Sequence, residues 1–493
     1  MPKNKVNPAV GGGVGVGVGG GGGWLDSAER TGADLHLELP VGGSRRAALA
    51  EALRAAVRDG RLPSGARLPP YRSLAADLGL ARNTVADAYA ELVAEGWLTA
   101  RQGSGTRVAE RAAPPAPVRR PRPAGAAPAG PVHDLVPGQP DAGSFPRAGW
   151  LSAARRALNE APNEAFGPGD PRGRIELRRA LADYLGRARG VRTDPDRIVV
   201  SAGFGHALRL LYGGGVLTGP LAVEAYGLSF HRELLDRAGV PHVPLPIDER
   251  GADTTALARL PRVRQVLLTA AHQFPTGGPL HRERRSAAVA WARAGGGLIL
   301  EDDYDGEFRY DRQPIGSLQG LDPERVVHMG SVSKSLSPAL RLGWIVLPED
   351  LVDAVLDAKG EREAWVSVPD QLTLAEFIAS GGYDRHVRRM RQRYRGRRDR
   401  LTAVLAARAP HVSVSGVAAG LHAVLTLPAG TEAVAVAAAR AHGVAVEPLS
   451  SFRHPAATQV ARDGLVIGYA TPPDHAYPAA LDALCEALAS VAG

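Results

Sequence analysis

Residues 111–132 separate two stretches of the chain whose residue patterns differ. They are mostly Pro, Ala, Arg and Gly without apolar periodicity, so they cannot offset the entropy of their own ordering. We expect an extended linker there, and the 493-residue chain is long enough for a small and a large folding unit beside it. We place these units at residues 31–110 and 133–493. Residues 1–30 are expected to be a disordered tail, because residues 11–23 contain only Gly and Val.

The positive charge of the chain is concentrated in its first part. Residues 44–131 contain 14 Arg, no Lys and 7 acidic residues, which gives +7 of the total net charge of +8. This predicts a polyanionic partner, and a basic solvated surface is the alternative. The single cysteine, Cys485, excludes disulfides within the chain and thiolate metal clusters, and we predict no metal site. Without a long apolar run or a leader, the protein is expected to be cytoplasmic and away from membranes.

Residues 31–110 show three helical patterns followed by two short strand patterns. Apolar residues at helical spacing predict a first helix between residues 49 and 57, a second near 72–78 and a third that carries Val85, Tyr89 and Leu92 on one face. Residues 97–99 and 106–108 read as two strands around a glycine-rich turn. Three helices and a β-hairpin predict a winged helix-turn-helix.

The polar residues around the third helix suit contact with double-stranded DNA. A recognition helix presents short polar groups and Arg to base edges and phosphates while its apolar face stays in the core. Arg72, at the start of the preceding helix, is placed to meet a phosphate. The backbone N–H groups of the wing can approach another phosphate. The predicted DNA-binding residues are Arg72, Arg82, Asn83, Thr84, Gly103, Ser104 and Gly105.

Four motifs occur here in a characteristic order and spacing. They are Gly60-Arg61-Leu62-Pro63-Ser64-Gly65-Ala66-Arg67-Leu68-Pro69-Pro70-Tyr71-Arg72-Ser73-Leu74-Ala75, Ala81-Arg82-Asn83-Thr84-Val85, Glu95-Gly96-Trp97-Leu98 and Gly103-Ser104-Gly105-Thr106. Together they resemble the GntR-type winged helix across residues 44–108. The resemblance implies a DNA operator as partner.

The second unit alternates strands with helices. Buried β-branched runs at residues 198–200, 266–268 and 298–300 are separated by helical stretches, which predicts a mostly parallel, doubly wound sheet of the α/β class. Between a strand and a helix beginning near Ala207 lies Ser201-Ala202-Gly203-Phe204-Gly205-His206. Small residues at such a turn expose N–H groups to a phosphate, although this motif alone is weak.

A lysine among small hydroxyl residues follows the predicted strand at 326–329. In Ser331-Val332-Ser333-Lys334-Ser335-Leu336-Ser337, the lysine can form a Schiff base and the hydroxyls can hold a phosphate. Arg341 can fork onto two phosphate oxygens. Upstream, Leu300-Glu301-Asp302-Asp303-Tyr304-Asp305 ends another strand with carboxylates and a phenol. These groups suit a pyridine N–H⁺ and a ring oxygen, and a solvated loop or a cation site is the alternative.

With the loop His272-Gln273-Phe274-Pro275-Thr276-Gly277, these motifs resemble fold-type I aminotransferases over residues 133–491. The GntR-like unit narrows the resemblance to MocR-type regulators, which implies a large and a small C-terminal subdomain and a head-to-tail homodimer. The cofactor implied is pyridoxal 5'-phosphate, with Lys334 as the Schiff-base lysine, Asp302 as the pyridinium partner and Tyr304 as the ring-oxygen donor. Asp303 is the alternative to Asp302. The phosphate cup implied comprises Ser331, Ser333, Arg341, Gly203, Phe204 and Gly205.

Three positions depart from the aminotransferase pattern. Phe274 stands where aminotransferases keep an Asn that hydrogen-bonds the cofactor. Val466 occupies the position of the carboxylate-binding Arg, and Arg453 is a candidate to replace that Arg. The segment Glu224-Ala225-Tyr226-Gly227-Leu228 alters the usual Pro-Gly-Tyr, which leaves the residue over the ring face open. The arginine-dense residues 388–400 are expected to be a solvated helix, with contact to bent DNA as the alternative.

These observations favour a transcription regulator that senses an amine, an amino acid or the cofactor itself through an aldimine on Lys334. Binding of that effector would change the geometry of the DNA-binding units. The alternative is an active aminotransferase with an accessory DNA-binding domain. At most a half-transamination or weak aminotransferase activity is expected.

Overall fold

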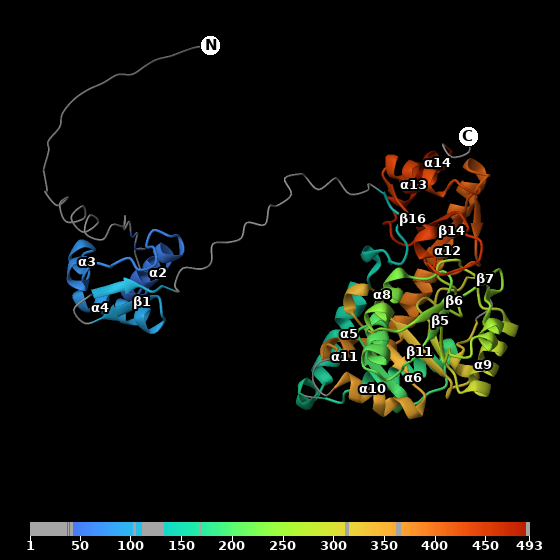
Figure 1. Cartoon of the computed structure of the whole chain (residues 1–493), viewed down its shortest axis with the longest axis horizontal. Helices are drawn as coiled ribbons and strands as arrows, with labels where there is room; N and C mark the ends of the chain where they lie inside the picture. The colour runs from blue at the N-terminus through green and yellow to red at the C-terminus, as the bar shows by residue number, and fades with distance from the viewer. Residues whose placement is uncertain are drawn as a thin grey trace, which may run out of the picture. The chain divides into compact units, whose positions relative to one another are not determined.

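The computed structural model describes residues 37, 39, 43–101, 105–110, 133–167, 169–310, 315–360 and 366–489. The described residues form two compact units, one on each side of the predicted linker (Figure 1). The predicted tail at 1–30, the predicted linker at 111–132 and the wing residues Gly103 and Ser104 lie outside the described residues. Among the described helices, none has the length and apolar character needed to cross a membrane.

The first unit is a winged helix-turn-helix, as the sequence predicts. Its elements are α2 (Arg45–Arg58), α3 (Tyr71–Asp77), α4 (Arg82–Ala94), β1 (Leu98–Arg101) and β2 (Gly105–Val108). The apolar faces of the three helices pack into one core around Leu53, Leu74 and Val85. The strands pair in antiparallel register, with Leu98 opposite Val108. This packing leaves the polar start of α4 at the surface.

A seven-stranded sheet forms the centre of the second unit. In spatial order its strands are β4 (Ile198–Ser201), β12 (Gly343–Val346), β11 (Val326–Ser331), β10 (Leu298–Asp302), β9 (Gln265–Leu268), β5 (Leu221–Glu224) and β6 (His242–Leu245). Only β12 runs antiparallel to its neighbours in this sheet. The prediction of a mostly parallel sheet is therefore confirmed.

Helices cover both faces of this sheet because successive strand residues point to opposite sides. On one face, Val200 and Trp344 pack with α5 (Arg147–Glu160), α6 (Ile175–Arg189) and α11 (Val368–Ala379), while Ile299 packs with α9 (Arg282–Gly295). On the other face, the alternate residues meet a second set of helices. That set is α7 (Phe204–Leu208), its π-helical continuation η4 (Arg209–Gly213), α8 (Ser229–Arg237) and α10 (Val352–Lys359).

A smaller subdomain follows the long helix α12 (Gly382–Arg408). It contains a four-stranded antiparallel sheet and two helices. Its elements are β13 (Ser413–Ser415), β14 (His422–Thr426), β16 (Glu447–Pro448), β17 (Gly464–Gly468), α13 (Glu432–Ala441) and α14 (Tyr477–Ala489). The first strand of the unit, β3 (His133–Asp134), pairs with β15 (Val444–Ala445) of this subdomain. A short hairpin of β7 (Ile247–Asp248) and β8 (Gly251–Ala252) lies in the larger part.

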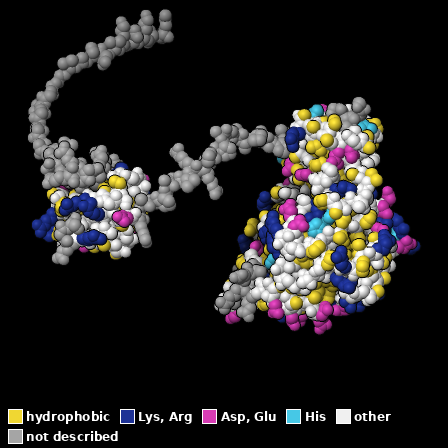
Figure 2. All heavy atoms as spheres, in the orientation of Figure 1, with side chains coloured by type: hydrophobic (Ala, Val, Ile, Leu, Met, Phe, Trp, Pro, Cys, Tyr) yellow, Lys and Arg dark blue, Asp and Glu magenta, His cyan; other side chains and the backbone are white. Residues whose placement is uncertain are grey.

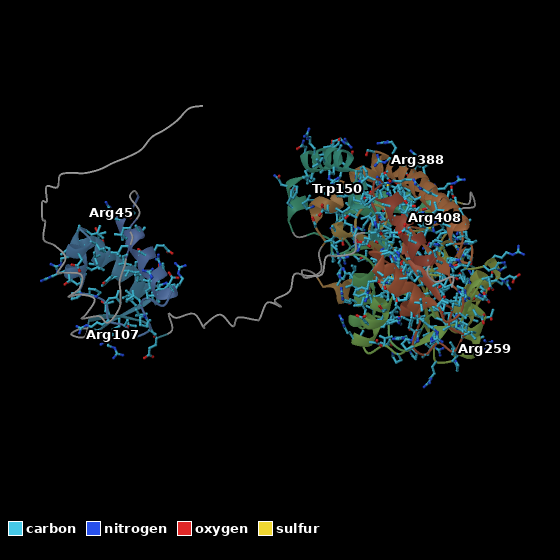
Figure 3. The ribbon with its side chains drawn as sticks, turned by 90° about the horizontal axis from the view of Figure 1, so that it is seen from above. Arg45, Arg107, Trp150, Arg259, Arg388 and Arg408 are labelled. Carbon is cyan, nitrogen blue, oxygen red and sulfur yellow. The ribbon has the colours of Figure 1, made fainter. Side chains whose placement is uncertain are left out.

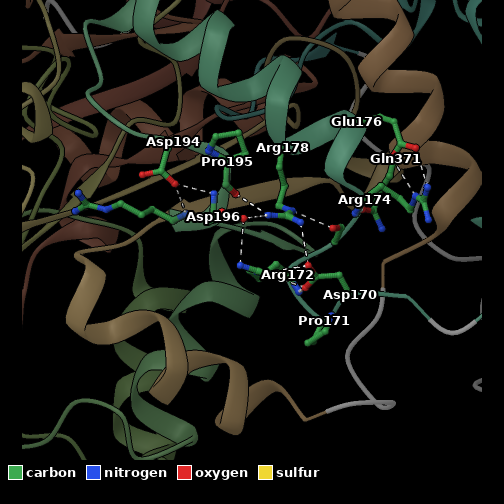
Figure 4. Close-up of polar contacts among 12 residues, drawn as sticks. Asp170, Pro171, Arg172, Arg174, Glu176, Arg178, Asp194, Pro195, Asp196 and Gln371 are labelled. Atoms are coloured by element: carbon green, nitrogen blue, oxygen red, sulfur yellow. Dashed lines mark hydrogen bonds and ion pairs between the residues drawn. The ribbon is translucent and has the colours of Figure 1, made fainter.

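Buried arginine fixes the segment that leads into α6. The guanidinium of Arg178, only 3% exposed, donates to Asp170 at 2.9 Å and to Asp196 at 3.1 Å (Figure 4). Arg178 also donates to the carbonyl oxygen of Pro195 at 2.8 Å. One side chain thus holds the loop before α6 against the turn that precedes β4, the strand that leads to the predicted phosphate turn.

The arginine-dense helix α12 is solvated only in part. Arg388 is exposed and points away from the unit (Figure 3). Arg397, by contrast, is 5% exposed and donates to the carbonyl oxygens of Tyr469 and Ala470 at 3.1 Å. Arg391 donates to the carbonyl oxygen of Glu307 at 2.9 Å. Several arginines of this run therefore join the two subdomains, which charge density alone did not predict.

Candidate functional site

A cavity of about 570 Å³ lies where the strands of the central sheet end. In open parallel sheets, ligands bind at the carboxyl ends of the strands, and the volume is typical of small-molecule sites. Because β12 runs antiparallel, the residues before it reach the same edge. Every cofactor residue predicted from the sequence lines this cavity, namely Lys334, Asp302, Tyr304, Ser331, Ser333, Arg341, Gly203, Phe204 and Gly205.

The turn after β4 and the residue before β12 form one wall. Gly203 has φ +93° and lies beside Arg341, since a Cβ there would be in ordinary contact with both terminal guanidinium nitrogens at 3.8 Å. Gly343 allows this approach, because its own Cβ would meet Gly203 Cα at 2.8 Å. Among the described residues, Arg341 is the sole non-glycine with positive φ, at 51°. Such backbone strain clusters at functional sites, and here it holds a guanidinium beside exposed N–H groups.

The helix after this turn starts earlier than the sequence indicated. We expected it near Ala207, but α7 begins at Phe204. Its cap is Gly203, and the N–H groups of His206 and Ala207 donate to the Gly203 carbonyl oxygen at 3.0 and 3.1 Å. Phe204 and Gly205 therefore occupy the first turn of the helix rather than a loop. The positive end of the helix dipole faces the cavity from this position.

Lys334 lies in the loop after β11, against the first segment of the unit. Its Nζ donates a hydrogen bond to the carbonyl oxygen of Gly138. Burial lowers the pKa of Lys334, while the charges of Asp302 and Asp305 oppose that shift. A lowered pKa increases the fraction of neutral amine, which is the nucleophilic form.

Neighbouring carboxylates at the end of β10 have different partners. Asp302 lines the cavity, whereas Asp303 forms a buried ion pair with Arg189, with N···O distances of 2.7 and 2.9 Å. Both side chains of that pair are 4% exposed. Burial, followed by the Asp303 charge, raises the pKa of Asp302 well above its usual value, and Lys334 acts in the opposite direction. The geometry thus favours Asp302 over Asp303 as the residue available to a ligand.

Replacing Arg189 by Met should strongly destabilise the second unit, because Asp303 would remain buried without its cation. We expect the free energy of unfolding to fall by about 3–5 kcal/mol in urea denaturation. Arg187→Met is the matched control on the same helix, since Arg187 is 59% exposed and pairs with Asp384 at 2.9 Å. That exposed pair should contribute less than about 1 kcal/mol. Equal losses in the two variants would contradict a special role for the buried pair.

The three departures from the aminotransferase pattern have clear structural settings. Phe274 lines the cavity and contacts the ring of Tyr304 edge-on at 5.9 Å. Val466 is fully buried in β17 within an apolar cluster and does not line the cavity. Arg453 does not line the cavity, and one of its terminal nitrogens donates to the carbonyl oxygens of Ala457 at 2.5 Å and Gln459 at 2.8 Å.

Several cavity residues were not singled out from the sequence. The carbonyl oxygen of Gly138 accepts a hydrogen bond from Lys334, although the two residues lie far apart in the chain. In the sequence, only its Pro-Gly turn could have drawn attention to Gly138. His231, on α8, packs on Phe204 with ring centroids 4.4 Å apart. Arg232 lines the cavity and donates to the carbonyl oxygens of Gly227 at 2.8 Å and Phe452 at 3.2 Å. These contacts join elements that no local pattern connects.

Those predicted DNA-binding residues that the structure describes lie at or near the surface of the first unit. Arg72, Arg82 and Asn83 are exposed, and Thr84 is half-buried. Figure 2 shows arginine side chains, in dark blue, gathered on the face of this unit that it displays. Tyr71, which the sequence analysis did not assign, orients Arg82: the guanidinium lies 5.1 Å from the ring centroid and donates to the hydroxyl at 3.2 Å.

At the wing, Gly105 is exposed and has φ +79°. A Cβ on Gly105 would lie 3.2 Å from Nε of Arg67, an exposed residue that was quoted in the motif but given no role. Residue 67 forms an antiparallel bridge with Arg107 of β2. The described part of the wing therefore carries arginine side chains in addition to its glycine backbone.

Comparison with known proteins finds a matching family for each of the two units. Residues 135–471 match the family Aminotransferase class I and II, and residues 45–108 match the family Bacterial regulatory proteins, gntR family. The crystal structure of the multiple substrate aminotransferase from Thermococcus profundus superposes with a TM-score of 0.66 at 24% identity, covering 73% of this chain and 91% of that one. This likeness shows the fold.

Named relatives match most of the chain along most of their own length. The probable rhizopine catabolism regulatory protein MocR of Rhizobium meliloti is 33% identical over 445 residues, which are 86% of this chain and 89% of the relative. The HTH-type pyridoxine biosynthesis transcriptional regulator PdxR of Corynebacterium glutamicum is 32% identical over 379 residues, which are 76% and 82% of the two chains.

A winged helix and an aminotransferase-fold unit together define a class of DNA-binding transcription regulators whose second unit is built like an enzyme. The chain belongs to this class, as a MocR-type regulator of the GntR family. Its second unit belongs to a fold family that depends on pyridoxal phosphate. The predicted fold class, family and regulatory function are thereby confirmed.

Proposed function

We propose that this regulator binds pyridoxal 5'-phosphate covalently through Lys334 and senses an amine, an amino acid or the cofactor itself. The observation that carries the proposal is the convergence of Lys334, Asp302, Tyr304 and Arg341 on one cavity. Bound pyridoxal phosphate would supply an aldehyde that reacts with amines and a ring that accepts electrons. The cavity residues would bind, orient and electrostatically adjust it.

The phosphate fits the wall formed by Gly203, Arg341 and the hydroxyls of Ser331 and Ser333. The absence of a side chain at Gly203 leaves space beside the guanidinium, and the start of α7 adds N–H groups. Asp302 would accept a hydrogen bond from the pyridinium N–H⁺. That cation would lower the pKa of Asp302, which burial raises, and so keep the carboxylate ionised.

An effector would enter the same cavity, where Lys334 would hold the aldehyde carbon of the cofactor. Among the described residues, Arg341 and Arg232 supply the guanidinium groups of the lining. Because Arg341 would bind the phosphate, Arg232 is the remaining guanidinium of the lining, and one of its terminal nitrogens is already bonded to two carbonyl oxygens. The effector would change the geometry of the DNA-binding units and thereby the affinity for an operator in double-stranded DNA.

We also propose that the protein acts in the cytoplasm as a head-to-tail homodimer. The dimer is implied by the resemblance to fold-type I aminotransferases. Exposed apolar side chains in the second unit support it: Leu151 is 67% exposed and Phe166 is 54% exposed. Apolar surface of this kind is typical of protein interfaces when it is contiguous. A DNA-binding regulator acts where the chromosome is.

The structure favours a sensor over an enzyme that turns over amino acids. A transaminase fixes the substrate carboxylate so that the Cα–H bond stands perpendicular to the ring, and a free arginine fork achieves this. Val466 provides neither charge nor donor and is buried outside the cavity. Arg232 has already committed one terminal nitrogen to two carbonyl oxygens. Amino acids should therefore bind without a fixed carboxylate.

We expect the wild-type protein loaded with pyridoxal phosphate to show at most a spectral shift or a single slow half-reaction with amino donors. The test is a steady-state transaminase assay with a panel of α- and ω-amino acids, together with stopped-flow spectra. Keto-acid production should not exceed about one equivalent per subunit, since each half-reaction consumes the bound cofactor once. Sustained production over many turnovers would instead favour the active aminotransferase.

A further inference from the structure

A closed polar chain lies behind Tyr304 that the proposed cofactor chemistry does not use. Nδ1 of His272 lies 2.8 Å from Oδ2 of Asp305 and 3.0 Å from the hydroxyl oxygen of Tyr304. The His272 and Asp305 side chains are 2% and 1% exposed. Three side chains from two different loops therefore meet at a single ring nitrogen, which is shielded from water.

The charge of Asp305 determines which ring nitrogen of His272 carries the hydrogen. An ionised carboxylate only accepts hydrogen bonds, so a neutral imidazole must carry its hydrogen on Nδ1 to avoid two facing lone pairs. The same N–H is then shared between Oδ2 of Asp305 and the oxygen of Tyr304 in a three-centre hydrogen bond. Since that oxygen receives a hydrogen from His272, the phenol hydrogen is directed elsewhere.

Tyr304 is well suited to donate that hydrogen toward the cavity. Burial, followed by the charges of Asp305 and Asp302, raises the pKa of Tyr304 well above its usual value, so the phenol stays protonated. Asp305 is the competing acceptor: it also hydrogen-bonds the Tyr304 side chain, while its Oδ2 is bonded to His272. A ring oxygen in the cavity would have to draw the phenol hydrogen away from Asp305. The amide that assists such a phenol in aminotransferases is replaced by Phe274, which offers no donor.

The other ionisable groups around this chain do not replace His272. His422, on β14, lies 5.1 Å from the His272 ring, but its Nε2 bonds to the carbonyl oxygen of Pro275 at 3.1 Å. Burial lowers the pKa of His422 to about 3, so it remains neutral. Glu224 influences the pKa of Tyr304, and Lys334 that of His422, through charge alone.

A metal ion is a weaker explanation of the same cluster. The ligand atoms of His272, Asp305 and His422 lie within 4.8 Å of one another. Gly420, however, packs against them: a Cβ on Gly420 would lie 2.5 Å from Oδ2 of Asp305 and 2.7 Å from Nδ1 of His272. Two atoms that could bind a cation, Nδ1 of His272 and Oδ2 of Asp305, are already hydrogen-bonded to each other.

We propose that His272, held by Asp305, is a positioning residue that directs the hydroxyl hydrogen of Tyr304 onto the ring oxygen of the cofactor. This inference rests on the proposed cofactor site. His272 would thus fulfil the function of the amide that Phe274 replaces. A stronger hydrogen bond to the ring oxygen stabilises its anionic form, and this lowers the pKa of the adjacent Schiff-base nitrogen.

Two amide substitutions test the proposal. His272→Asn keeps a donor near the position of Nδ1, whereas His272→Gln moves the amide to the position of Nε2. Visible absorbance of the cofactor-loaded full chain is titrated with pH. The midpoint should rise by about one pH unit in His272→Gln, a tenfold change in proton affinity. It should stay at the wild-type value in His272→Asn. His422→Gln is the matched control and should also leave the midpoint unchanged.

The outcomes separate the two proposals. A wild-type midpoint in His272→Gln overturns the positioning role, as does an equal shift in His422→Gln. In a Tyr304→Phe background, His272→Gln should cause no further shift, and an unchanged shift there also contradicts the proposal. If the wild-type protein takes up no chromophore from pyridoxal phosphate, the cofactor site itself is wrong and this inference falls with it.

Discussion

Lys334→Ala should abolish covalent attachment of pyridoxal phosphate, whereas the wild-type protein should be yellow and form one reducible adduct per chain. The chain contains few amines that could compete, since its lysines are Lys3, Lys5, Lys334 and Lys359. Among the described lysines, only Lys334 lines the cavity. The measurement is borohydride reduction followed by intact mass and peptide mapping, with the visible absorbance recorded before reduction.

Lys359 provides a demanding control for this experiment. Like Lys334, it is buried, and burial lowers its pKa to about 8. Its Nζ donates to the carbonyl oxygens of Pro171 at 2.5 Å and Val200 at 2.7 Å, outside the cavity lining. Lys359→Met should therefore keep the adduct. If Lys334→Ala keeps the adduct while Lys359→Met loses it, a lowered pKa alone selects the lysine and the cavity assignment is wrong.

The fold of the second unit was predictable where the pattern is local. The strands β4, β9 and β10 contain short runs of Val, Leu and Ile, because strands covered by helices on both faces are largely apolar. The motifs after β4, β10 and β11 were assigned to one cofactor site, and the cavity contains all of the predicted cofactor residues. The antiparallel direction of β12 has no local signature, although it is what brings Arg341 to the same edge.

Other parts of the site depend on contacts between distant segments. The choice between Asp302 and Asp303 required Arg189, which lies far from both in the sequence. The contact between His272 and Asp305 likewise joins two loops that follow different strands. Each partner alone has the appearance of an ordinary polar residue at a strand end. Sequence patterns therefore identified the residue types of the site, and the sheet topology determined which of them meet.

The first unit illustrates the same distinction on a smaller scale. Helical periodicity predicted α2, α3 and α4 because their buried faces form one core. It also placed Arg72 and Arg82 at exposed helix starts. The orientation of Arg82 by Tyr71 was not predictable, because that contact joins residues on two helices across a turn.

Arg72→Ala combined with Arg82→Ala should weaken DNA binding by about 100-fold or more at physiological salt. One phosphate contact contributes to binding of every sequence and to its salt dependence, while one base contact is worth about 1–3 kcal/mol of discrimination. Arg72 is exposed at the start of α3, and Arg82 is held by Tyr71 at the start of α4. Fluorescence anisotropy with a duplex from upstream of the gene, and with a random duplex, measures both effects across a salt series.

The single variants should divide this loss in a characteristic way. Arg72→Ala should weaken binding to both duplexes alike and reduce the slope of log K against log salt by about one. Arg82→Ala should mainly reduce the preference for the upstream duplex over the random one. The charge-matched control is Arg237→Ala with Arg259→Ala, since both side chains are 73% exposed in the second unit. An equal loss in that control would mean that net charge governs binding, and wild-type affinity in the Arg72, Arg82 double variant would mean that the helix-turn-helix meets DNA through another face.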